Sequence, residues 1–188
     1  MNGNTLVLRA LHRGENRLAG QLITVAQRHR TEHEVFHVAT DLARWSREHV
    51  GLLAEAAKDQ GTDLDELPHE ADRAPDPSEG SGGCDPSEGP KGSDGSDGGV
   101  LATVREKAAE IMGRRPEPGL LLLRDLRDLH LAATENSLYW EMLAQAAQAG
   151  RDDALLALVS SCHPQTLRQL RWSNTMIKNL SPQILTSL

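Results

Sequence analysis

Apolar residues recur every three or four positions along several long stretches of this chain. In the first stretch, from Thr5 to about Gln27, they are Leu8, Leu11, Leu18, Leu22 and Val25. This spacing places the side chains on one face of an α-helix. Two further stretches show the same helical spacing of apolar residues. The first contains Val35, Val38, Leu42, Trp45, Leu52 and Ala56. The second contains Leu122, Leu126, Leu129, Ala133, Trp140, Leu143 and Ala147. We predict helices over 5–27, 32–60, 119–149 and 153–180.

Turn residues separate these helices in pairs. Thr31 and Glu34 have the spacing of a capping box, in which each side chain binds a free backbone N–H at a helix start, and Gly61 follows the second helix as a stop signal. Gly150 is the expected stop of the third helix and Asp152 the expected N-cap of the fourth. Helices that are joined by such short turns pack side by side in antiparallel directions. The sequence therefore predicts two antiparallel helical hairpins.

The last helix contains a proline within its length and another near its end. Pro164 cannot donate a backbone hydrogen bond, so we expect a kink or a restart there, with His163 as the cap. Pro182 is expected to end the helix.

A polar segment separates the two hairpins. Residues 62–99 hold eleven Asp or Glu against two basic residues, about −9 net, and repeat Asp-Pro-Ser-Glu-Gly at 76–80 and 85–89. Such a composition buries too little apolar area to offset the entropy of ordering. We predict a hairpin over 1–61, a disordered acidic linker over 62–99, and a short extra helix (100–112) plus the second hairpin within 100–188. The fold class is all-α, a four-helix bundle with a long disordered crossover linker, in which the hairpins pack as one domain.

Composition excludes several classes of function. The whole chain carries −7, so the part outside the linker carries about +2 (−7 + 9), and a body without clustered Lys and Arg is not expected to bind nucleic acid. No eighteen apolar residues run together and no leader precedes the first helix, so we expect no membrane contact and a cytoplasmic location. Cys84 and Cys162 offer no disulfide framework. Without nucleophile or phosphate-binding motifs, no enzymatic turnover is expected unless a metal supports it.

The two hairpins also show a short internal similarity. With a shift of 120 positions, Glu15 and Asn16 fall on Glu135 and Asn136, which suggests a duplicated hairpin. Two antiparallel hairpins joined by a long crossover resemble the ferritin-like four-helix-bundle superfamily. The resemblance covers the helical parts of the chain and is one of architecture.

The resemblance implies a candidate metal site. In di-iron members, the first and third helices each contribute a Glu, and the second and fourth each contribute Glu-x-x-His. Glu15 and Glu135 match the first and third positions, while Glu48 and His49 lie at the matching depth of the second helix. Residue 51 is Gly where the motif has His, and 165–169 holds neither carboxylate nor His. The implied site is a single iron or manganese ion held by Glu15, Glu48, His49 and Glu135.

A different interpretation needs no metal. An acid on an apolar seam must be paired to be buried, and His49 or Arg168 would serve as the partner of Glu15 in a structural salt bridge. The chain would then be a non-enzymatic helical scaffold or protein-interaction module that binds another protein or a second copy of itself. The sequence leaves both hypotheses open.

Overall fold

The computed structural model describes residues 3–64 and 117–187, and these ranges are helical apart from short turns and ends. The helices are α1 (Gly3–Arg28), α2 (His33–Asp59), α4 (Pro118–Gly150) and α5 (Asp153–Thr186). They confirm the all-α fold class and the four-helix bundle of two antiparallel hairpins. Most of the predicted linker and all of the predicted short helix lie in 65–116, outside the described residues.

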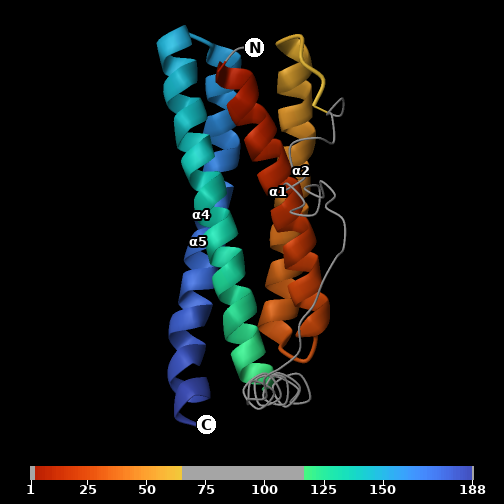
Figure 1. Ribbon diagram of the computed structural model, residues 1–188, viewed down its shortest axis with the longest axis vertical. Helices are drawn as coiled ribbons and strands as arrows, with labels where there is room; N and C mark the ends of the chain where they lie inside the picture. Colours follow the sequence, from red (N-terminus) through yellow and green to blue (C-terminus); the bar gives the residue numbers. More distant parts are fainter. Residues whose placement is uncertain (1–2, 65–116, 188) are drawn as a thin grey trace, which may run out of the picture. The chain divides into compact units, whose positions relative to one another are not determined.

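Each helix packs on two others. The two hairpins, α1 with α2 and α4 with α5, make the closest contacts, α1 also packs on α4, and α2 touches α5 least. Neighbouring helices run antiparallel, so α2 and α4 run in the same direction at opposite corners of the bundle (Figure 1). This arrangement brings one face of every helix toward a shared interior.

That interior has an apolar part toward each end. The cluster near the α1–α2 turn, at the bottom of Figure 1, contains Leu18, Leu22, Leu126 and Ala133. The cluster near the α4–α5 turn, at the top, contains Leu8, Leu11, Leu53, Trp140 and Leu143. Between them every helix turns small or polar side chains inward, a set that we call the mid-bundle polar layer. Its buried members are Gly14, Glu15, Ser46, His49, Asn136, Ser137, Thr166, Gln169 and Ser173.

The inward face of α2 differs from the predicted one in its second half. Leu52, which we expected on the seam, is 41 % exposed, while Ser46, His49 and Leu53 are buried. The true seam continues at steps of three and four from Leu42 through these residues. Because two of its members are polar, apolar periodicity alone selects Trp45 and Leu52 instead.

The helix starts are only partly as predicted. No side chain caps the start of α2, so the predicted capping box of Thr31 and Glu34 was wrong. The prediction for α5 is confirmed, because the Asp152 carboxylate accepts a hydrogen bond of 2.9 Å from the Leu155 backbone N–H. Gly61 follows the end of α2 with φ +72°, a left-handed conformation that glycine adopts without steric cost.

Both prolines lie inside α5, so the predictions that the helix restarts at Pro164 and ends at Pro182 were wrong. The helix continues through Pro164 and Pro182 to Thr186. Pro164 and Ser160, whose carbonyl loses its helical donor, are both exposed. Water can satisfy that carbonyl, so a helix held by packing on its opposite face tolerates the proline.

Candidate functional site

The centre of the polar layer is the carboxylate of Glu15, which is fully buried. Its Oε1 accepts hydrogen bonds from the Trp140 indole N–H at 3.1 Å and from the Thr166 hydroxyl at 3.4 Å. Its Oε2 lies 3.3 Å from Nδ1 of His49, which is 1 % exposed. One side chain of α1 thus contacts a polar group from each of the other three helices.

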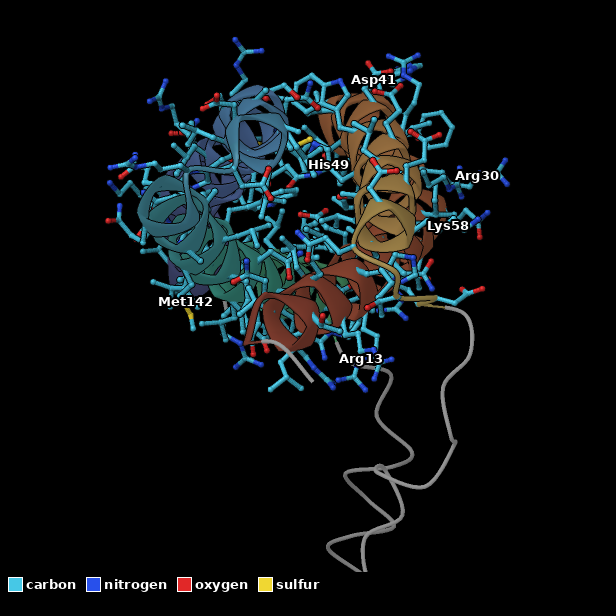
Figure 2. All side chains as sticks on the ribbon, turned by 90° about the horizontal axis from the view of Figure 1, so that it is seen from above. Arg13, Arg30, Asp41, His49, Lys58 and Met142 are labelled. Atoms are coloured by element: carbon cyan, nitrogen blue, oxygen red, sulfur yellow. The ribbon has the colours of Figure 1, made fainter. Side chains whose placement is uncertain are left out.

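The ring of His49 is held from its other side. Nε2 lies 3.1 Å from the side-chain amide of Gln165, within hydrogen-bond distance of its Oε1. The Trp140 ring meets the imidazole edge-on, with centroids 5.6 Å apart. Figure 2 shows His49 directed into the space between the helices. These contacts aim Nδ1 at Glu15.

The two facing atoms of the pair need a hydrogen or a cation between them. Neither Nδ1 of His49 nor Oε2 of Glu15 has a hydrogen-bond partner, although their separation of 3.3 Å is within ion-pair range. A bare Nδ1 would present a lone pair to the carboxylate, and the two would repel. A hydrogen on Nδ1 would let the ring donate to the carboxylate. A metal ion is the chemical alternative, because two ligands each about 2.0–2.2 Å from a tetrahedral ion lie about 3.4 Å apart.

The other two predicted ligands lie on the outside. Glu48 and Glu135 are exposed, and Glu135 bonds Arg17 at 2.6 Å. Successive helical residues point about 100° apart. The helices are rotated so that His49 and Asn136 face the core, while their predecessors Glu48 and Glu135 are exposed. The structure therefore brings together two of the four predicted residues, Glu15 and His49.

The shift of 120 positions that relates the hairpins does not match their buried faces. It pairs buried Glu15 with exposed Glu135, and buried Leu18 with Leu138, which is 56 % exposed. The residue of α4 that faces inward at this level is Asn136, one position later. The similarity in sequence is therefore not a similarity of inward faces.

Asn136 is the functional-site neighbour that the sequence did not identify. Both polar atoms of its amide are buried without a hydrogen-bond partner among the described residues. The amide lies directly on Gly14 of α1, and a Cβ placed on that glycine would overlap Oδ1 and lie 3.2 Å from Cγ. A glycine in mid-helix, beside a buried acid, was the available signal for this close approach.

Further hydrogen bonds tie the polar layer across helices. Two histidine–serine pairs link α4 to α5: His130 Nδ1 to Ser173 at 3.0 Å, and His163 Nε2 to Ser137 at 2.9 Å. His163 therefore does not cap a restarted helix. Between α5 and α2, the side-chain amide of Gln169 donates to the Leu42 carbonyl and to the Ser46 hydroxyl. These hydrogen bonds connect α2, α4 and α5 through their side chains.

A second polar cluster ties the end of α1 to the start of α4. The carboxylate of Asp125 is buried and accepts two hydrogen bonds of 2.8 Å from the Arg28 guanidinium. It also lies 2.8 Å from Nε2 of the buried His29. Arg28 is the last residue of α1 and His29 follows it, so this cluster is a second link between the hairpins.

The buried thiol of Cys162 lies close to the polar layer. Burial raises the pKa of this thiol, a hydrogen bond with Ser161 works in the opposite direction, and the negative charges of Glu15 and Glu48 raise it further. The thiol is thus held in its protonated form, a poor nucleophile. Cys84 lies outside the described residues.

Within residues 3–64 and 117–187, no three His, Cys, Asp or Glu side chains gather where they could hold a metal ion together. None of the helices in these ranges combines the length and apolar character that a bilayer span requires. No protein-family model matches the chain, and neither curated proteins nor solved structures gave a match.

Proposed function

We propose that this protein is a non-enzymatic helical scaffold that acts by binding another protein. Its mid-bundle polar layer fixes which helices pair and at what depth, and its outer faces are left for the partner. The observation that carries the proposal is the Glu15 carboxylate, which contacts His49, Trp140 and Thr166 from three different helices.

The layer is suited to this role because its contacts are directional. Sliding α1 by a single turn would move its side chains by about 5.4 Å and separate Glu15 from all three partners. A buried acid without its partners costs several kcal/mol. Apolar packing above and below would tolerate such a shift more easily, so the polar contacts select one alignment.

The second candidate is a ferritin-like bundle that holds one iron or manganese ion. The observation that favours it is the pair of unpartnered atoms, Glu15 Oε2 and His49 Nδ1, at a separation that suits two ligands of one ion. The parallel run of α2 and α4, which requires a long crossover between them, is also the arrangement of ferritin-like folds. Iron and manganese prefer more carboxylate and imidazole ligands than this pair supplies, so we place the scaffold first.

Elemental analysis of the untagged protein, grown with iron and manganese supplied, separates the two candidates. It is combined with urea denaturation of Glu15→Gln, which keeps the shape of the side chain and removes its charge. For a scaffold, wild type carries no stoichiometric metal, and Glu15→Gln loses about 3–5 kcal/mol, the cost of breaking a buried pair. The matched control Glu135→Gln breaks only the half-exposed contact with Arg17 and is expected to lose less than about 1 kcal/mol.

A double variant sharpens the result. Replacing His49 as well, in Glu15→Gln/His49→Gln, removes both members of the pair and is expected to recover most of the lost stability. Near-stoichiometric iron or manganese in wild type that disappears in Glu15→Gln would overturn the scaffold proposal and support the metal-binding bundle.

A further inference from the structure

The weakest helix contact in the bundle leaves a groove on its surface. Near the end of α2 and the start of α5, the two helices enclose a groove of about 390 Å³. Its lining comes from both helices: Leu52, Glu55, Ala56, Asp59 and Gln60 on one side and Asp152, Ala154, Leu155 and Leu158 on the other. The volume is within the range of protein binding sites.

The α2 side of this groove carries a row of acidic residues around one exposed leucine. Glu48, Leu52, Glu55 and Asp59 follow one another at steps of four, three and four, so they share one face of the helix. The row extends for about 17 Å at 1.5 Å per residue. Glu48 lies two helical turns before Glu55, which lines the groove, so it is on the same side of α2.

Within the described part of the chain, residues 3–64 and 117–187, the carboxylates of Glu48, Glu55 and Asp59 form no ion pairs. Lys58 points away from α5 (Figure 2). The carbonyl end of α2 adds partial negative charge, while Asp152 already caps the positive start of α5. The groove therefore has an acidic rim and an apolar floor.

We propose that the α2/α5 groove binds an amphipathic helix that carries lysine or arginine on its flanks and leucine-like side chains on its buried face. The floor formed by Leu52, Leu155 and Leu158 receives the apolar side chains, and the acidic row pairs with the flanking cations. Insertion of a helix into a groove between two helices is a common mode of peptide recognition. This inference rests on the proposed scaffold function and names its docking site and the chemistry of its partner.

Fluorescence anisotropy with a labelled 14-residue leucine–lysine amphipathic peptide tests the site on the full chain. We expect saturable binding that weakens between low and high salt, and no binding of the same peptide with glutamate in place of lysine. Glu55→Lys/Asp59→Lys should weaken binding at least tenfold. The control Glu34→Lys/Glu141→Lys makes the same change in net charge at exposed positions elsewhere and should change binding less than twofold.

A substitution at Leu52 separates docking from simple charge attraction. Leu52→Asp adds a negative charge and removes part of the apolar floor, so the proposal expects weaker binding, whereas charge attraction alone would strengthen it. The control is Leu138→Asp on the outer face of α4, where the leucine is 56 % exposed. It should not weaken binding.

Three outcomes would overturn the proposal: no binding of the basic peptide, equal losses in the two charge-reversed variants, or tighter binding by Leu52→Asp. Sedimentation of the same proteins tests a fourth outcome. If wild type were a dimer and Leu52→Asp a monomer, a second copy of the chain would occupy the groove, and the proposal would be overturned. Metal content is measured on the same preparations. Stoichiometric metal would refute the scaffold function, whereas failure of peptide binding by metal-free protein would refute only the groove.

Discussion

Gly14 offers a test of the close contact between α1 and α4. Replacing a mid-helix glycine with alanine normally stabilises a helix by about 1 kcal/mol, because alanine has the higher helix propensity. At Gly14 the added methyl would overlap Oδ1 of Asn136 and lie 3.2 Å from its Cγ. Asn136 is fully buried, so its amide cannot turn away without moving its neighbours.

The two effects have opposite signs and comparable size. Overfilling a packed interior costs about 1–3 kcal/mol, and the severe overlap places Gly14→Ala in the upper part of that range. After the gain in propensity, we expect a net loss of about 1–2 kcal/mol. Gly20 and Gly51 are exposed helical glycines with nothing near the position of an added methyl, so each change to alanine should stabilise by about 0.5–1 kcal/mol.

Urea denaturation followed by circular dichroism measures these free energies, and a double-mutant cycle assigns the cause. Asn136→Ala removes the amide that the new methyl would meet, so Gly14→Ala should cost at least about 1 kcal/mol less in that background. If Gly14→Ala instead stabilised the protein as much as Gly20→Ala does, the close packing of α1 on α4 at this level would be refuted.

Two further predictions concern buried groups outside the Glu15 pair. Asp125→Ala leaves His29 buried without its carboxylate and should cost about 1–3 kcal/mol in urea denaturation. The control Asp128→Ala breaks only exposed contacts with Arg124 and Arg127 and should cost less than about 1 kcal/mol. Equal losses in the two variants would contradict the role of the Asp125 cluster. In a Cys84→Ser background, Cys162 should react with iodoacetamide far more slowly in the folded than in the urea-unfolded protein at pH 8, because burial raises its pKa above the ordinary value of 9.0. Since the unfolded chain then loses the thiol proton first, the contribution of this group to stability should decline as the pH rises above about 9; rapid alkylation of the folded protein would contradict the burial.

The helices and their antiparallel pairing could be predicted because they depend on local chemistry. The steps of three, seven and four between Leu8, Leu11, Leu18 and Leu22 require only that one helical face be apolar. The cap at Asp152 likewise depends on residues next to it in the chain. Pro164 misled the prediction because its cost is local, whereas the packing that offsets it comes from other helices.

The functional site depended on information that no single stretch of sequence contains. The sequence marked Glu15 as a buried acid and named His49 as one possible partner, but Glu48 and Glu135, the other two expected metal ligands, lie at the same approximate depth. Their exclusion from the core follows from the rotation of α2 and α4 about their own axes. That rotation is set by packing against the neighbouring helices.

The sequence by itself thus determined where the helices lie, which of them are paired, and that the first carries an acid in its apolar face. Only the tertiary structure decided that Asn136 rather than Glu135 faces inward, and that Leu52 lies at a groove rather than in the core. The physical reason is that helix formation is governed by neighbours three or four residues apart. The inward position of a polar side chain is decided by hydrogen-bond partners more than a hundred residues away.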